Sequence, residues 1–322
     1  MIEPSHTHPP TPPMTRATFL RIAAASATAM LLGGRSVNAF SAPSAAMATR
    51  PIPASGEALP VIGVGTYQGF DVARGSAEHA RLPGVVEALF AAGGSVIDSS
   101  PMYGRAEATT GEVLTALGGH ARAFVATKVW TRGRAAGLRQ MEDSLRLMRL
   151  PSERPLDLIQ VHNLVDWRTQ LATLRDWKAA GRVRYIGITH YSASAYDELA
   201  AVMRAERFDF LQINYSLDER EADQLILPLA AERGMAVLIN RPFGGGGLLR
   251  RLRERPLPAW AGEIDAGSWA QVLLKFVLSQ PAVTCAIPGT GRAEHMADNA
   301  RAGSGRIPDA RFWQRHADAI SA

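Results

Sequence analysis

The feature that most constrains the fold of this chain is an eightfold alternation of short apolar runs with longer amphipathic stretches. We expect the apolar runs to be β-strands at residues 61–65, 95–98, 124–128, 156–162, 185–189, 210–214, 236–240 and 283–287. The stretches between them repeat apolar residues every three or four positions, which is typical of helices with one buried face. We expect these helices at residues 83–92, 106–117, 135–149, 168–180, 193–204, 223–233 and 268–279.

Strands that alternate with helices pair in parallel, and eight such units without a break predict one α/β domain, a (β/α)8 or TIM barrel. The main alternative is an open, doubly wound sheet. That fold usually carries Gly-x-Gly-x-x-Gly in its first strand-to-helix turn, and the chain lacks the motif there. We interpret residues 50–60 as a short hairpin that plugs the bottom of the barrel.

Four polar residues stand at or just after the ends of three consecutive expected strands. Asp98 ends the second strand and Tyr103 follows it, whereas Lys128 ends the third strand and His162 the fourth. Barrel enzymes carry their chemistry at the carboxyl ends of the strands. We therefore expect these four side chains to meet at one mouth.

The four groups together can protonate a carbonyl oxygen. A phenol titrates near about 10, and an ammonium about 4 Å away, at an effective dielectric of about 20, favours the phenolate by about 4 kcal/mol, or about three pKa units. We therefore predict that Lys128 lowers the pKa of Tyr103 and makes Tyr103 a general acid, while Asp98 keeps Lys128 charged. His162 either donates a hydrogen bond to the carbonyl oxygen or passes a proton to Tyr103. Because none of these groups supplies a hydride, an external donor must bind beside them.

From about residue 50 to residue 302 the chain resembles the aldo-keto reductase superfamily. The motifs are GVGTYQ, IDSSPMYG, ATK, QVHN, RYIGIT, FLQINYS and the closing IPGT-x4-H-x3-N. The resemblance implies that Asp98, Tyr103, Lys128 and His162 are the catalytic tetrad of an oxidoreductase acting on CH–OH groups. It further implies reduction of a small-molecule aldehyde or ketone by NADPH, with NADH as the alternative donor.

The resemblance also implies a cofactor site across the barrel mouth. The implied contacts are Gly65, Thr66, Asp98, Thr189, His190, Gln212, Asn240, Arg241, Pro242, Phe243, Thr290, Arg292, His295 and Asn299. Substrate selectivity would come from residues 68–81, 164–168, 250–267 and 303–322, with Trp130, Trp167, Trp260 and Trp313 as candidate apolar walls.

The chain departs from the family pattern at three places in this cofactor site. Thr189-His190 replaces the usual Ser-Asn pair, and Asn240 stands where an aromatic ring normally stacks on the nicotinamide. Phe243 would replace that ring if its loop bends inward. His295 stands where many members have an arginine for the 2′-phosphate, a loss that Arg292 would offset.

Two alternatives to a working reductase remain open. One is a nucleotide-binding regulatory or sensor protein of the same fold with little turnover; the altered Thr189-His190 and Asn240 positions favour it and the complete tetrad disfavours it. The other is a barrel hydrolase or lyase that uses the same Lys and His. No metal-ligand cluster or second carboxylate in the sequence supports this last reading, and we predict no metal site.

The first 48 residues are typical of an export signal and flexible tail, which leaves 49–322 as the folded domain. A basic start precedes a short apolar core at 22–32, and Ala46-Met47-Ala48 fits a small-x-small cleavage pattern. The start resembles a twin-arginine signal, but Ala17 stands where the second arginine belongs. We expect the cell's export machinery to carry the protein to the periplasm; it stays cytoplasmic if the signal does not function. Met14 is an alternative start, which would remove the Pro-rich tail.

Composition argues against two classes of partner. The net charge of +5 comes from arginines scattered among acidic residues, so we expect no nucleic acid partner. No apolar run has the length and flanks of a stable membrane span. The single cysteine, Cys285, rules out an intramolecular disulfide, and its apolar surroundings indicate a buried small side chain rather than a nucleophile.

Overall fold

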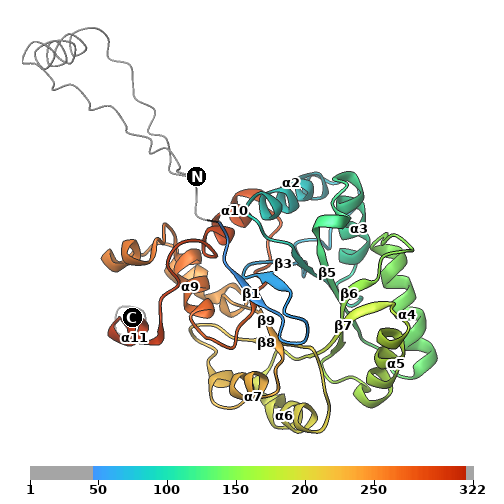
Figure 1. Ribbon diagram of the computed structural model, residues 1–322. Coiled ribbons are helices and arrows are strands. Elements are labelled where there is room, and N and C mark those ends of the chain that lie inside the picture. The colour runs from blue at the N-terminus through green and yellow to red at the C-terminus, as the bar shows by residue number, and fades with distance from the viewer. Residues whose placement is uncertain (1–45, 317–322) are drawn as a thin grey trace, which may run out of the picture. The chain divides into compact units, whose positions relative to one another are not determined.

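The computed structural model describes residues 46–316, which contain one closed parallel barrel. Its strands are β3 (Val64–Gly65), β4 (Val96–Asp98), β5 (Phe124–Val129), β6 (Leu156–His162), β7 (Val183–Thr189), β8 (Phe210–Asn214), β9 (Ala236–Asn240) and β10 (Cys285–Ala286). They are paired in chain order, and bridges from Ile62 to Ala286 and from Gly65 to Gly289 join the last strand to the first. Figure 1 shows the helices arranged around this ring. The predicted (β/α)8 barrel is confirmed.

The helices alternate with the strands as predicted. They are α2 (Ala77–Ala91), α3 (Ala106–Ala116), α4 (Arg134–Leu147), α5 (Trp167–Ala179), α6 (Tyr196–Ala205), α7 (Ile226–Glu232), α8 (Gly247–Leu252), α9 (Trp269–Leu278), α10 (Ala293–Arg301) and α11 (Ala310–Arg315). Short 3-10 turns include η4 (Glu221–Asp223), η5 (Gly244–Gly246) and η6 (Ala259–Ile264). Over residues 46–316, no helix combines the length and apolarity that crossing a bilayer requires.

Helix α2 begins earlier than the sequence indicated. Its expected range was 83–92, and the observed helix contains Pro83 seven residues after its N-cap. In the structure the Oγ of Ser76 accepts a hydrogen bond from the backbone N–H of His79, so Ser76 caps a helix that contains Pro83 in its interior. The N-cap therefore defines this boundary, and the helix accommodates the proline.

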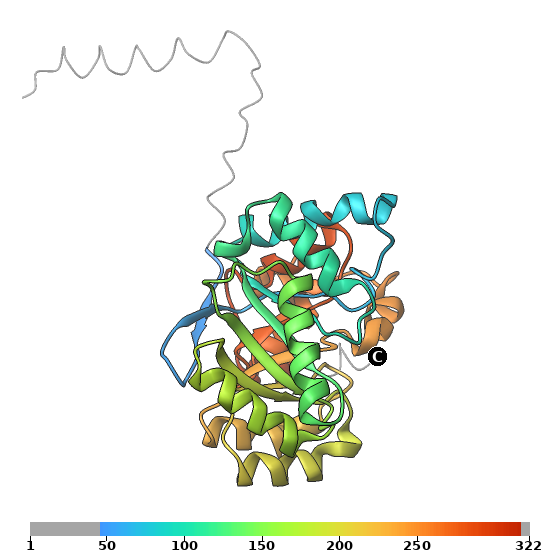
Figure 2. The ribbon, with the colours of Figure 1, turned by 90° about the vertical axis from the view of Figure 1, so that its right-hand side faces the viewer.

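A two-stranded hairpin closes the bottom of the barrel, as predicted. It consists of β1 (Thr49–Pro51) and β2 (Ala58–Pro60), and Figure 2 shows it at one end of the barrel. Its buried side chains Ile52 and Leu59 belong to the same apolar cluster as the inward-facing strand residues Phe124 and Phe210. Because this end is filled by side chains, the polar groups at the opposite end define the open mouth.

The chain that leads into the hairpin also packs on the barrel. Met47 is only 9% exposed and lies in the core, and the backbone N–H of Ala48 donates to the carbonyl of Gly303 at 2.8 Å. The ordered part of the fold thus includes Met47 and Ala48, whereas residues 1–45, which hold most of the expected export signal, lie outside the described residues. The expected domain boundary at 48/49 stays a prediction.

We expect a chain starting at Thr49 to be less stable than one starting at Ala46. The shorter chain loses the buried Met47 side chain, whose burial contributes about 1.5–3 kcal/mol. Urea unfolding of both chains measures this difference, and Met47→Ala in the longer chain should reproduce most of it. Equal midpoints and slopes for the two chains would contradict the packing role of Met47.

Candidate active site

The structure brings the four strand-end residues together. Because β4, β5 and β6 are parallel neighbours, Asp98, Lys128 and His162 lie at the same end of the sheet. The Nζ of Lys128 donates to Asp98 Oδ2 at 2.7 Å and lies 5.0 Å from the centre of the Tyr103 ring. The rings of Tyr103 and His162 meet edge to face, 6.0 Å between centres. A carboxylate, an ammonium, a phenol and an imidazole thus form one cluster.

The ion pair between Lys128 and Asp98 is buried, and both partners form further hydrogen bonds. The Lys128 side chain is fully buried and that of Asp98 nearly so. Lys128 also donates to the carbonyl of Ser99 at 2.7 Å, while Asp98 Oδ1 accepts from Gln212 at 2.8 Å and from Gln160 at 3.4 Å. Both carboxylate oxygens of Asp98 are therefore hydrogen-bonded, as a buried charge requires.

The pKa of Lys128 is raised, so the side chain is an ammonium. Burial alone would lower this pKa, but the charge of Asp98, together with interactions with Tyr103, outweighs the burial. Asp98 therefore keeps Lys128 charged in a site that water does not reach.

The pKa of Tyr103 is also raised, and the predicted net lowering was wrong. Burial of the phenol raises its pKa most; Lys128 is the strongest opposing influence, and Asp98 raises the pKa further. The sequence argument counted the attraction of Lys128 but not the desolvation of the phenolate. Tyr103 is thus a neutral phenol that holds its proton, with a fixed cation beside the oxygen that would become negative on proton loss.

His162 is a neutral imidazole. Burial, then the charges of Lys128 and His190, lower its pKa to about 2. A neutral imidazole can still donate one hydrogen bond, whereas proton transfer from an imidazolium is excluded near neutral pH. The expected role of His162 as a hydrogen-bond donor is compatible with a neutral ring, and its role in passing a proton to Tyr103 stays a prediction.

We expect the neutrality of His162 to make stability depend on pH. In the unfolded chain His162 binds a proton below about pH 6.5, whereas in the folded chain it stays neutral down to about pH 2. Its contribution is therefore complete above pH 6.5 and decreases as the pH falls. From pH 6.5 to pH 5 the loss is about 2 kcal/mol.

Urea unfolding at pH 7 and pH 5 tests this dependence. Wild type should lose about 2 kcal/mol more than His162→Gln over that interval, because only wild type carries the titrating group. If both proteins lose the same free energy of unfolding, the imidazole is not held neutral.

The sequence matches a known protein family over most of the described residues. The model of the aldo/keto reductase family matches residues 61–315.

The chain belongs to the aldo/keto reductase family.

Its relatives in this family are distant. The aldo-keto reductase YhdN of Bacillus subtilis (strain 168) is 26% identical over 208 residues, which cover 60% of this chain and 61% of YhdN, less than two thirds of that protein. The aldo-keto reductase str7 of Strobilurus tenacellus is 26% identical over 264 residues, 70% of this chain and 77% of str7. A crystal structure of an aldo-keto reductase from Klebsiella pneumoniae in complex with NADPH superimposes with a TM-score of 0.70 at 23% identity, covering 85% of this chain and 95% of that one.

Part of the cofactor set implied by the aldo/keto reductase pattern lies beside the tetrad. Gln212 contacts Asp98 directly, and the hydroxyl of Thr189 lies 3.4 Å from Gln212 Oε1. Asn240 donates through Nδ2 to the carbonyl of His190 at 3.2 Å, while its Oδ1 is buried with no donor within the described chain. Asn240 therefore presents an acceptor at the position where the family resemblance led us to expect an aromatic ring.

Phe243 is a largely buried residue of the loop after β9. Its side chain is 8% exposed and belongs to the main hydrophobic core cluster. That Phe243 replaces the aromatic ring missing at Asn240 stays a prediction. Arg241 and Pro242 precede Phe243 in this loop, and Arg241 pairs with Glu219 at 2.7 Å.

Arginines line the glycine-rich segment that follows. Gly244, Gly245 and Gly246 all have positive φ, between 56° and 87°. A methyl group added to Gly245 would lie 3.3 Å from Nη2 of Arg241, and one added to Gly246 would lie 3.5 Å from Nη1 of Arg250. Open backbone next to guanidinium groups is an arrangement that suits a phosphate.

The remaining expected cofactor residues flank the join between β3 and β10. Gly65 ends β3, and the buried Thr66 donates its backbone N–H to the carbonyl of Asp98. On the other side, Thr290 and Arg292 precede α10, while His295 and the buried Asn299 lie within it. Arg292 pairs with Glu294 at 2.6 Å on the surface, so a phosphate there would have to displace a carboxylate.

Two buried polar residues of the cluster were missed by the sequence reasoning. Gln160 contacts Asp98, and Ser100 contacts His162. Gln160 lies two residues before His162 on β6, and strand alternation places both on the same side, a signal that the sequence contains. Ser100 follows the end of β4, where no periodicity indicates its direction.

Three of the four candidate tryptophan walls, Trp130, Trp260 and Trp313, lie in two different parts of the fold. The ring of Trp130 is 42% exposed and lies 6.5 Å from that of His162, next to the cluster. Trp260 and Trp313 pack against each other in the core, 5.9 Å apart. Only Trp130 of these three is placed to contact a molecule bound beside His162.

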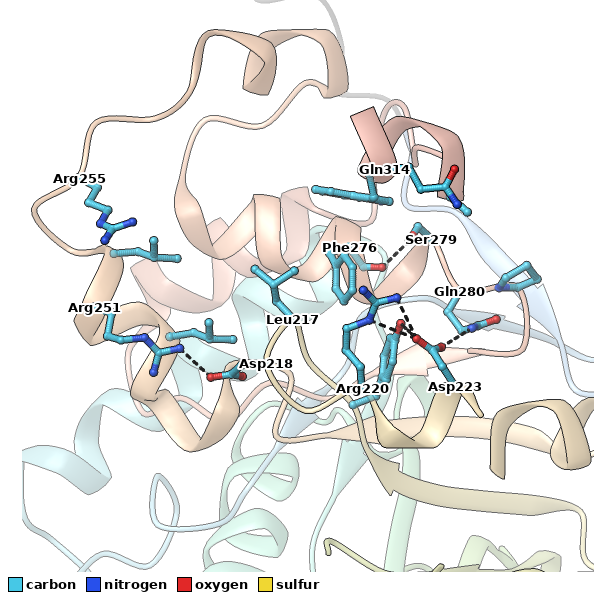
Figure 3. A pocket seen from close by; sticks show the side chains of 16 residues that line it. Leu217, Asp218, Arg220, Asp223, Arg251, Arg255, Phe276, Ser279, Gln280 and Gln314 are labelled. Carbon is cyan, nitrogen blue, oxygen red and sulfur yellow. Dashed lines mark hydrogen bonds and ion pairs between the residues drawn. The ribbon is translucent and has the colours of Figure 1, made fainter. Parts of the chain in front are cut away.

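A cavity of about 870 Å³ lies elsewhere, and none of its lining residues belongs to the tetrad. The loop after β8, together with α8, α9 and α11, forms its walls. Figure 3 shows Arg251 directed at Asp218, and Arg220 and Gln280 directed at Asp223. Because its two carboxylates are neutralised by its own arginines, we place the chemistry in the buried tetrad and not in this cavity.

The predicted burial of the Cys285 side chain is confirmed. Cys285 is fully buried, and burial raises the pKa of its thiol, as expected of a packing residue. Across residues 46–316, no group of three or more His, Cys, Asp or Glu side chains is arranged to hold a metal ion.

Proposed function

We propose that this protein reduces an aldehyde or ketone to the alcohol with NADPH as the hydride donor. The observation that carries the proposal is the buried Lys128–Asp98 pair next to Tyr103, with neutral His162 edge to face with the phenol ring. The family membership and the NADPH complex of the Klebsiella pneumoniae relative support it.

The residues of this chain would handle the proton of such a reaction. NADPH, when bound, supplies the hydride to the carbonyl carbon. Tyr103 donates its phenolic proton to the carbonyl oxygen as negative charge grows there, and the resulting phenolate is stabilised by the Lys128 ammonium. Asp98 prevents Lys128 from losing its charge, and His162 donates a hydrogen bond to the same oxygen. The raised pKa of Tyr103 keeps the proton in place until the hydride arrives.

The chain offers groups of the right chemistry to hold NADPH. The free acceptor Oδ1 of Asn240 suits the amide N–H of the nicotinamide carboxamide, and Gln212 lies near it along the sheet. The glycines after β9, with Arg241 and Arg250, suit the pyrophosphate. Arg292 would bind the 2′-phosphate in place of its pairing with Glu294.

A panel assay tests the proposal. Purified full-length protein is incubated with NADPH, or with NADH, and a series of aldehydes and ketones, while oxidation of the cofactor and its binding are measured separately. Oxidation that depends on the carbonyl compound supports the reductase. Tight binding without oxidation would favour a nucleotide sensor, which the polar Asn240 in place of a stacking ring motivates. Absence of binding overturns both.

We also propose that residues 1–48 direct export to the periplasm. The basic start and the apolar core support this proposal, whereas Met47 and Ala48 of the small-x-small pattern pack on the barrel. Fusing these residues to a reporter that is active only outside the cytoplasm tests it; a reporter that stays inactive, next to an active control signal, would refute it.

A further inference from the structure

Ser100 forms a contact with His162 that the reaction described above does not use. Its side chain is fully buried, and its Oγ lies 3.0 Å from Nδ1 of His162. The same oxygen accepts a hydrogen bond from the backbone N–H of Met102 at 3.3 Å. The hydroxyl therefore sits between a group that can only donate and a ring nitrogen that can either donate or accept.

Two arrangements are possible: Nδ1–H of His162 donates to Ser100, or the hydroxyl of Ser100 donates to Nδ1. The hydrogens available in each arrangement distinguish them. A serine hydroxyl has one proton to donate and can accept two hydrogen bonds. If Nδ1–H of His162 donated to Ser100, the hydroxyl would accept twice and its own proton would need another acceptor. Within residues 46–316 no further partner contacts Ser100 Oγ, so that proton would be buried and unpaired. If instead Ser100 donates to Nδ1, the buried hydroxyl proton is paired. The hydrogen then left without a protein partner is Nε2–H of His162, which is not among the fully buried unpartnered atoms of residues 46–316.

We propose that Ser100 is a positioning residue that holds His162 in the tautomer with its proton on Nε2. The neutral imidazole has a single N–H, so the tautomer decides which nitrogen can donate. With Nδ1 accepting from Ser100, Nε2–H is the donor available to a carbonyl oxygen. The catalytic value of this arrangement rests on the proposed reductase function; the tautomer itself does not.

Because His162 is neutral, its tautomer decides whether the ring can donate a hydrogen bond to the carbonyl oxygen. An imidazolium would donate from both nitrogens, and Ser100 would then have no influence on the donor. Burial and the charge of Lys128 keep the ring neutral at physiological pH. A ring held in the wrong tautomer would present a lone pair, and not an N–H, to the carbonyl oxygen.

Nitrogen NMR of the full-length protein, labelled with ¹⁵N-histidine, tests the proposal directly. The His162 signals are assigned by their absence in His162→Gln. In wild type at neutral pH we expect Nε2 to carry the proton and Nδ1 to have the shift of an unprotonated nitrogen. Protonated Nδ1 in wild type overturns the proposal without reference to any variant.

Variants then test whether Ser100 is the cause. In Ser100→Ala we expect a mixture of the two tautomers, whereas Ser100→Thr, which keeps the hydroxyl, should restore the Nε2–H form. Ser99→Ala is the matched control, because Ser99 is an equally buried neighbour whose hydroxyl bonds Thr66 and not His162. It should keep the wild-type tautomer. A Ser100→Ala spectrum identical to that of wild type overturns the assigned role.

Kinetics separate this proposal from the proposed function. If the protein is a reductase, Ser100→Ala should lower kcat about tenfold, the value of one hydrogen bond, with KM nearly unchanged and activity regained in Ser100→Thr. If the protein oxidises no NADPH with any carbonyl compound but shows the Nε2–H signal, the proposed function fails and the tautomer assignment stands.

Discussion

Replacing Tyr103 by phenylalanine should reduce carbonyl reduction by about a thousandfold or more while leaving cofactor affinity nearly unchanged. The substitution removes the phenolic proton, and a positioned general acid contributes roughly 10²–10⁴-fold. The ring remains, so the contacts with Tyr67 and His162 that fill this part of the site persist. Steady-state kinetics measures the first effect, and titration of NADPH by the quenching of protein fluorescence measures the second.

Tyr67→Phe is the control for this experiment. The Tyr67 ring lies 5.0 Å from that of Tyr103 and is 57% exposed, so the same chemical change is made next to the tetrad without removing its acid. It should retain most of the turnover. A Tyr103→Phe protein that turns over as fast as the Tyr67→Phe protein would mean that the proton comes from another group.

Replacing Lys128 by methionine should affect both the pH dependence of turnover and the stability of the fold. Lys128 is the strongest influence that lowers the pKa of Tyr103, so its removal raises that pKa further above the usual value. The basic limb of the pH–rate profile should therefore move to higher pH as turnover falls. Asp98 would be left buried without its cation, which costs about 3–5 kcal/mol of unfolding free energy.

Lys275→Met separates these two effects. Lys275 is also fully buried, but its Nζ donates to the carbonyls of Ser304 and Arg306, outside the tetrad. This variant should lose stability and keep the wild-type pH–rate profile. If the profile of Lys128→Met coincides with that of wild type, the electrostatic role of Lys128 is refuted. Should Lys128→Met fail to fold, Lys128→Met with Asp98→Asn removes the unpaired charge and allows the same measurement.

The fold could be predicted from sequence most accurately where strands pair on both sides over many residues. Strands β6, β8 and β9 have the predicted bounds because nearly all of their residues are buried by helices and by neighbouring strands. The first and last strands were predicted as five residues each but pair over only two. The apolar residues of these two predicted strands are buried. A buried residue, however, does not have to form hydrogen bonds with a neighbouring strand.

The candidate site was predictable in its members but not in its electrostatics. Strand ends placed Asp98, Lys128 and His162 at one mouth, because parallel strands share their direction. The pKa of Tyr103 depends on how completely the surrounding loops bury it, which spacing along the chain does not encode. The direction of Phe243 and the contact of Ser100 with His162 depend on loop geometry in the same way.

The first and last strands, β3 and β10, close the barrel through few residue pairs. Where β10 meets β3, isolated bridges replace the longer ladders found between strands such as β6 and β7. The backbone amides of Gly63 and Gly65 donate to the carbonyls of Ala286 and Pro288. Local opening there breaks few backbone hydrogen bonds. A dinucleotide bound by Thr66 on one side and Arg292 on the other would hold the first and last strands together. Its binding would slow the exchange of the Gly63 and Gly65 amide protons with deuterium.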